Sequence, residues 1–147
     1  MKRELQMIRI IAFLVLLSGP AFSQSVYPPG STPFTASATG TTGAITATIP
    51  AVASRTAFIC GFYYMGTNAT TANTATSVTI TGISGGTMTY GFPTLAAAAT
   101  VPNTIPVDES FLPCIPASAQ NTAIVVNGPA LGTGATLATA SIWGFYQ

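Results

Sequence analysis

Beyond residue 23 the chain carries only three charged side chains, Arg55, Asp108 and Glu109, and it contains no histidine. Its water-facing surface must therefore be made of Thr, Ser, Asn, Gln and backbone groups. Threonine favours strands because it branches at Cβ, and its hydroxyl can face water. Because 48% of the residues are hydrophobic, the low charge does not indicate disorder here. We therefore expect a folded β domain with an almost uncharged surface.

Short runs in which apolar and polar residues alternate recur along the chain and predict β-strands. Turn residues separate these runs, as at Ser84-Gly85-Gly86, whose flanking runs form the clearest hairpin. The predicted strands are 34–38, 44–49, 55–65, 76–83, 87–92, 105–112, 122–127 and 136–146. We predict an all-β, single-domain β-sandwich of the jelly-roll type, with about eight short antiparallel strands.

The stretch 55–65 is the most hydrophobic part of the chain after residue 23, which is typical of a buried central strand. Strict alternation would give this strand two sets of side chains on opposite faces. The first set is Phe58, Cys60, Phe62 and Tyr64, and the second is Ala57, Ile59, Gly61 and Tyr63. Residues 115–121 are predicted to form a turn after the strand that ends at 112.

Residues 1–23 have the parts of a secretory signal peptide. Basic residues are followed by an apolar run at 10–17, and Ala21 and Ser23 place small side chains before a cleavage site. The run is shorter than the roughly 20 residues that span a bilayer, which favours a cleaved signal over an uncleaved membrane anchor. We expect export to the periplasm, the cell surface or the medium, with no membrane span after cleavage.

Cleavage after residue 23 would leave 124 of the 147 residues, enough for one domain with one core. Residues 24–33 are rich in Pro, Gly and Ser and predict an extended N-terminal segment. Residues 34–147 are then the sandwich domain.

Cys60 and Cys114 both follow the signal segment. An even pair of cysteines in an exported protein most simply forms a disulfide. A metal site would need about four ligands, and a catalytic thiol would need a histidine base, so both alternatives are disfavoured. We predict a Cys60–Cys114 disulfide and no metal site.

The same scarcity of ionisable groups restricts the chemistry of the chain. Acid–base catalysis and charge stabilisation need side chains that are missing here, and a catalytic triad is impossible without histidine. Nucleic acids and anionic membrane surfaces are bound by several cations, whereas Arg55 is alone. We expect a protein that is not an enzyme, uses no cofactor and does not bind nucleic acid.

Asp108 and Glu109 are the only carboxylate side chains after residue 23. Neighbours on a strand point to opposite faces, so this pair is badly placed to act as a two-carboxylate glycosidase. In a turn the two could instead bind calcium together with backbone carbonyls. The simplest interpretation is a charged edge strand that discourages pairing with other sheets. Pro106, which lacks a ladder donor, also indicates an edge strand.

Several aromatic side chains allow two interpretations. As flat rings with polar handles they could form a platform on which sugars stack, but most lie inside predicted strands and are expected to fill the core. They are Tyr63, Tyr64, Tyr90, Trp143 and Tyr146. The Asn/Thr-rich loop 66–75 is a second candidate for an adhesive surface, and Asn68 within it begins a glycosylation sequon.

Three stretches together resemble a group of small Ala/Thr/Gly-rich β proteins of bacterial and phage genomes, mostly without an assigned function. They are 58–62 (FICGF), 112–124 (LPCIPASAQNTAI) and 143–145 (WGF). The resemblance covers roughly residues 44–147 and implies a sandwich with a Cys60–Cys114 bridge, without implying an activity. The extension 24–38 and the penultimate Tyr146 also resemble subunits of chaperone–usher pili, although Cys60 lies deeper in the chain than the first cysteine of those subunits.

The uncharged exterior has a consequence for association, because like-charge repulsion is what normally keeps protein molecules apart. We therefore expect an exported structural or interaction protein that associates with itself or coats a surface. The alternative is a carbohydrate-binding or adhesive module whose partner is a surface glycan or protein.

Overall fold

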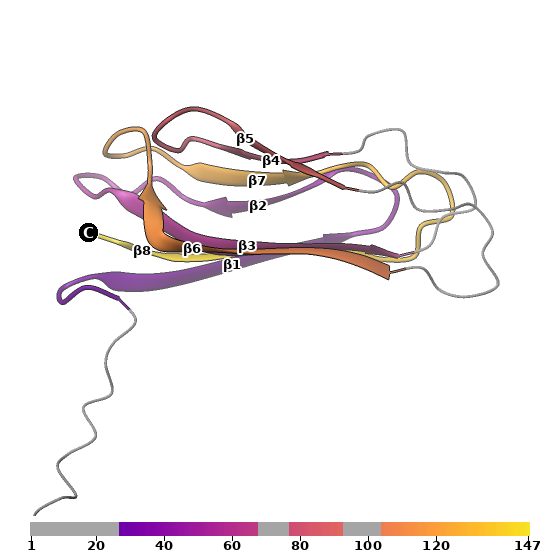
Figure 1. Cartoon of the computed structure of the whole chain (residues 1–147), viewed down its shortest axis with the longest axis horizontal. Coiled ribbons are helices and arrows are strands. Elements are labelled where there is room, and N and C mark those ends of the chain that lie inside the picture. The colour runs from indigo at the N-terminus through magenta and orange to yellow at the C-terminus, as the bar shows by residue number, and fades with distance from the viewer. Residues whose placement is uncertain (1–26, 68–76, 93–103) are drawn as a thin grey trace, which may run out of the picture.

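The computed structural model describes residues 27–67, 77–92 and 104–147, and these form two antiparallel sheets that pack face to face. Figure 1 shows the two layers edge-on. The strands are β1 (Thr32–Gly40), β2 (Ile45–Ile49), β3 (Ala57–Thr67), β4 (Ser77–Thr81), β5 (Met88–Gly91), β6 (Thr104–Pro116), β7 (Ile124–Gly128) and β8 (Ala138–Tyr146). The predicted signal peptide 1–23 and the sequon at Asn68 lie outside the described residues.

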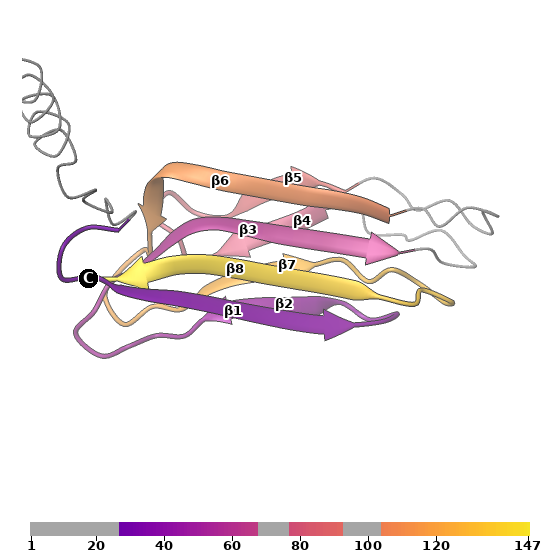
Figure 2. The same ribbon diagram turned by 90° about the horizontal axis from the view of Figure 1, so that it is seen from below.

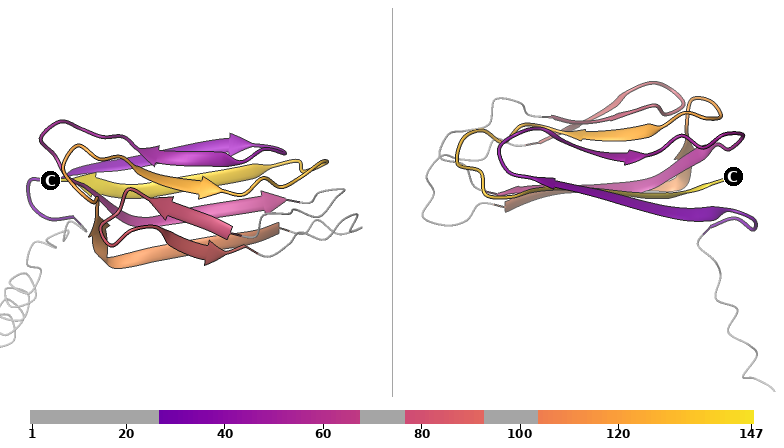
Figure 3. Two further views of the ribbon diagram at one scale, coloured as in Figure 1. Left: turned by 90° about the horizontal axis from the view of Figure 1, so that it is seen from above. Right: turned by 180° about the vertical axis from the view of Figure 1, so that it is seen from behind.

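The strand order identifies a jelly roll. One sheet, called sheet A here, has the order β1-β8-β3-β6, and the other, sheet B, has the order β2-β7-β4-β5. Consecutive strands therefore alternate between the sheets in the manner of two Greek keys, except that β4 and β5 pair with each other within sheet B. Figure 2 looks onto the outer face of sheet A, and the left panel of Figure 3 looks onto sheet B. The predicted all-β sandwich is confirmed.

Each of the eight predicted strands is present, and the largest differences lie at strand ends. The first strand begins at Thr32, inside the segment 24–33 that the sequence predicts to be an extended N-terminal segment. The sixth strand runs on to Pro116, so the turn predicted for 115–121 begins later. Ala117, just after β6, forms an isolated antiparallel bridge with Ile83, which follows β4, so paired backbone continues one residue past the end of β6.

The predicted faces of β3 are wrong because the strand contains a bulge. The pairing of β3 with β8 passes from Ile59↔Gly144 to Gly61↔Trp143, so Cys60 is an extra residue. A bulge of this kind inserts one residue and reverses the alternation after it. Ile59 and Phe62 consequently both point into the core, while Phe58 does not belong to the core cluster.

The core lies between the sheets and consists mainly of aliphatic side chains with a few aromatic rings. Its largest fully buried members are Tyr64, Phe62, Phe92, Ile49, Ile59, Ile80, Ile124, Leu131 and Ile142. Two tyrosine hydroxyls are satisfied by backbone carbonyls, with Tyr64 donating to Pro129 O at 2.8 Å and Tyr146 to Pro50 O at 2.9 Å. These bonds connect the core to the loops at the ends of the sandwich.

Candidate functional site on the outer face of sheet A

The outer face of sheet A carries large apolar side chains in its middle strands. The register aligns Phe58 with Phe145, Gly61 with Trp143, and Tyr63 with Ser141 across β3 and β8. Met65 follows in the next outward position of β3 and is aligned with Thr139. Aromatic and thioether groups therefore form a stripe over these two strands, and threonines and serines of β1 border it on one side.

The outer face of sheet B is of a different kind. Its cross-strand rows consist of hydroxyl and amide groups with a single valine, namely Thr46, Thr48, Ser77, Thr79, Thr81, Thr89, Val125 and Asn127. Asn127 Nδ2 donates to Thr79 Oγ1 at 3.5 Å within this face. An antiparallel sheet usually has one apolar face toward the core and one polar face toward water. Sheet B follows this rule, whereas the outer face of sheet A carries an apolar stripe beside its hydroxyl residues.

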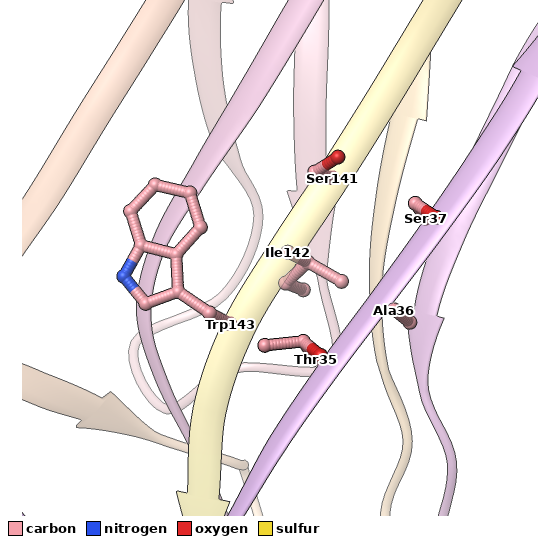
Figure 4. Close-up of a pocket in the computed structure, with 6 residues that line it drawn as sticks. All are labelled: Thr35, Ala36, Ser37, Ser141, Ile142 and Trp143. Carbon is pink, nitrogen blue, oxygen red and sulfur yellow. The ribbon is translucent and has the colours of Figure 1, made fainter.

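Trp143, the only tryptophan of the chain, lies over Gly61 of the neighbouring strand. A Cβ at Gly61 would collide with the indole ring, so the absence of a side chain lets the ring lie against the sheet. On the side of β8 that faces away from β3, a trough of about 310 Å³ lies between β8 and β1. Figure 4 shows the indole reaching away from β1, with the hydroxyls of Thr35, Ser37 and Ser141 along the trough.

An apolar hollow lies at the end of the same face, beside the Phe58 and Phe145 rings. These rings stack with centroids 4.8 Å apart and planes 7° from parallel, and Tyr27 packs on Phe145 at 5.5 Å. The hollow measures about 310 Å³ and is lined by Pro28, Phe58, Leu112, Pro113, Cys114, Phe145 and Gln147. No charged side chain lines it.

The predicted disulfide is present, and it joins the neighbouring strands β3 and β6 at this hollow. The register between the two strands passes from Ile59↔Ile115 to Gly61↔Ser110, so residues 111–114 form an insertion opposite Cys60. We call this insertion the projection; it exposes Leu112 and Pro113, while Phe111 packs against the core. Cys114 ends the projection, and its bond to Cys60 ties the projection to the centre of sheet A. Sequence reasoning found the pair of cysteines but not this projection.

The predicted aromatic residues divide between core and surface. Tyr64 and Tyr146 are buried, and burial raises the pKa of both phenols, to about 12 for Tyr64. Tyr90 packs against the core, where burial, and to a smaller extent the charge of Glu109, raise its pKa. Tyr63 and Trp143 instead lie on the outer face of sheet A, so the expectation that such rings fill the core is wrong for these two. Most of the loop 66–75 lies outside the described residues.

Asp108 and Glu109 lie on β6, which is an edge strand of sheet A as predicted. Asp108 is aligned with Tyr63 and is exposed, whereas Glu109 is aligned with Phe62 and is half-buried on the core side. The two carboxylates therefore point to opposite faces and do not converge on one site. The third charged residue, Arg55, donates a hydrogen bond from Nη1 to Thr32 Oγ1 at 2.7 Å.

Within residues 27–67, 77–92 and 104–147, no three Cys, Asp or Glu side chains gather in a way that could hold a metal ion. In the same ranges, no helix is long and apolar enough to cross a membrane.

No protein-family model, curated protein or solved structure matches the chain significantly. The resemblances noted from the sequence therefore remain predictions, and function is argued from the residues of the chain alone.

Proposed function

We propose that this protein is an exported, non-enzymatic structural protein that self-associates through the outer face of sheet A. The contrast between the two outer faces carries the proposal. Sheet B presents Thr, Ser and Asn to water, whereas sheet A presents the stripe of Phe58, Tyr63, Met65 and Trp143. A contiguous apolar surface rimmed by polar residues is typical of an interaction site.

The size of this face supports a second copy as the partner. Four strands about 4.8 Å apart, with about nine residues rising about 3.4 Å each, cover roughly 600 Å². Two such faces would bury about 1,200 Å², which is the lower limit for a specific protein interface. The face is therefore large enough for a homodimer or a small ring.

The distribution of charge also supports self-association. Arg55, Asp108 and Glu109 are the only charged residues after residue 23, so two copies repel each other only weakly. Asp108 lies at the margin of the face, on the edge strand β6, and leaves the aromatic stripe uncharged. Few ions would need to be desolvated when two such faces meet.

Two observations support export, and a third supports a non-catalytic role. The Cys60–Cys114 disulfide is consistent with an oxidising compartment, and the N-terminal 23 residues have the pattern of a signal peptide. The two carboxylates of the domain point to opposite faces, so they cannot act together on one bond.

Sedimentation velocity of the exported, disulfide-intact chain tests the proposal. We expect concentration-dependent association that is weakened when two side chains of the stripe become polar, in the double variant Tyr63→Thr and Met65→Thr. The matched control carries Thr46→Val and Thr89→Val on the outer face of sheet B and should associate like the wild type. A wild-type chain that is strictly monomeric at high micromolar concentration would contradict self-association.

A second candidate function is favoured by the trough beside Trp143. A neutral sugar could place its apolar C–H face on the indole and direct its hydroxyls toward Thr35, Ser37 and Ser141. This occupant would compete with a second copy for the same face. A glycan array with the Trp143→Ala variant as its control distinguishes the two, because binding that requires Trp143 supports the sugar and an empty array removes it.

A further inference from the structure

Leu112 is exposed to an unusual degree for a leucine. Its exposed fraction is 97%, whereas the other large exposed hydrophobic residues among those described, Val52 and Leu137, reach only 36% and 38%. It is part of the projection 111–114, which the Cys60–Cys114 bond ties to the sheet. A large apolar side chain is therefore held in water at a defined position, where it loses the stabilisation that burial would give.

The hollow beside Leu112 complements it in size and polarity. Its walls are the Phe58 and Phe145 rings, Pro28 and Pro113, and its volume of about 310 Å³ can admit a leucine side chain. Leu112 itself stands at the rim and, at 97% exposure, does not fill the hollow of its own chain. A projecting apolar side chain and an unfilled apolar hollow thus lie next to each other on one surface.

We infer that two copies of the chain associate around a two-fold axis at this end of sheet A, with each Leu112 entering the hollow of the other copy. In a two-fold interface both copies use the same surface, so that surface must carry both members of a complementary pair. Residue i of one copy then contacts residue j of the other, and residue j of the first contacts residue i of the second. The inference rests on the proposed self-association and specifies its contact. The stacked Phe58 and Phe145 rings make the hollow continuous with the aromatic stripe.

A second copy fits better than a partner of other chemistry. No charged side chain lines the hollow, so nothing in it would select an ionic ligand or an anionic membrane surface. Leu112 is apolar, as are the rings and prolines that form the walls of the hollow. Each chain carries one projecting leucine and one hollow, so in a dimer every leucine has a hollow to enter. Two reciprocal contacts would form in each dimer.

The experiment uses two variants that each damage one half of the contact. Leu112→Ser removes the projecting side chain, and Gln147→Arg places a charge at the rim of the hollow. The backbone of Gln147 is held by hydrogen bonds to Thr56 in both directions, at 2.8 and 3.0 Å, so a new side chain there leaves the strand end in place. Leu137→Ser is the matched control, because it removes an exposed leucine that does not line the hollow.

Sedimentation equilibrium of each exported variant gives the dimer dissociation constant. We expect Leu112→Ser to raise it at least about a hundredfold, because each dimer buries two leucines, and Leu137→Ser to change it less than about threefold. A mixture of the Leu112→Ser and Gln147→Arg chains should form heterodimers, since one intact projection meets one intact hollow.

The outcomes separate this inference from the proposal on which it rests. If the wild type is monomeric, self-association itself fails. If the wild type associates but Leu112→Ser and Gln147→Arg associate equally well, only the Leu112 contact is overturned. Equal weakening by Leu137→Ser would show unspecific apolar association and would also overturn it. Binding of the wild-type chain to zwitterionic phosphatidylcholine vesicles, lost with Leu112→Ser, would assign the projection to a lipid surface instead.

Discussion

The indole of Trp143 lies directly over Gly61, on the outer face of sheet A, where a methyl group on the glycine would collide with the ring. The same methyl group would come within 2.5 Å of the backbone carbonyl oxygen of Glu109 on the other neighbouring strand. Position 61 therefore requires glycine, because the Trp143 ring on β8 and the Glu109 carbonyl on β6 both come too close for a Cβ. This contact sets the orientation of the largest aromatic side chain on the proposed interaction surface.

Gly61→Ala is expected to lower the free energy of unfolding by about 1–3 kcal/mol, the usual cost of overpacking, because the carbonyl of Glu109 cannot move aside. It should also displace the indole and shift the emission of the single tryptophan. Urea unfolding and fluorescence spectra measure both effects. Gly91→Ala is the control, since nothing lies within 4 Å of a Cβ built at that strand glycine. Equal stability of the two variants would contradict the close approach.

The disulfide is expected to contribute to stability mainly through the unfolded chain. Cys60 and Cys114 are 54 residues apart, and closing a loop of this length corresponds to roughly 4 kcal/mol in the chain-entropy model. The double variant Cys60→Ala and Cys114→Ala should unfold with a free energy about 2–4 kcal/mol lower than the wild type. A reducing agent should destabilise the wild type and leave the double variant unchanged. If reduction left the free energy of unfolding of the wild type unchanged, the disulfide would contribute nothing to stability.

Alkaline pH is expected to destabilise the fold through its buried tyrosines. Burial raises the pKa of Tyr64 from 10.0 to about 12, so between these values the unfolded chain has lost a proton that the native chain keeps. The stabilisation is complete below about pH 10 and is lost as pH rises toward about 12.

Urea unfolding from about pH 8 to about pH 12 measures this decline. Tyr64→Phe should cost about 1 kcal/mol at neutral pH, because it removes the hydrogen bond to Pro129 O, and it should make the alkaline decline shallower. An equally steep decline in the variant would show that Tyr64 is not responsible.

The strands could be predicted from the sequence because their alternation is local, whereas the bulge at Cys60 could not. All residues from 57 to 66 are apolar or aromatic, so an inserted residue leaves no mark in the pattern. The bulge nevertheless reverses the faces, and it places Phe62 in the core and Phe58 outside. Tertiary pairing with β8, which is distant in sequence, decides this placement.

The position of Trp143 could have been found from the sequence. In β8 the small and apolar residues Ala138, Ala140 and Ile142 alternate with Thr139, Ser141 and Trp143. The tryptophan therefore shares a face with two hydroxyl residues, which indicates an outward position. Its place inside a predicted strand favoured the core interpretation, although the alternation within that strand indicates the outward face. The projection at Leu112 has no such local signal, because it depends on how β6 pairs with β3.

Trp143 also provides the most direct measurement of self-association, because the only tryptophan of the chain lies in the middle of the proposed interface. Its emission and its quenching by acrylamide can be followed as the exported, disulfide-intact chain is diluted from high micromolar to nanomolar concentration. Self-association through sheet A predicts that dilution shifts the emission to the red and increases quenching, with a midpoint that the Tyr63→Thr, Met65→Thr variant moves to higher concentration. Emission and quenching that stay constant over the whole range would contradict it.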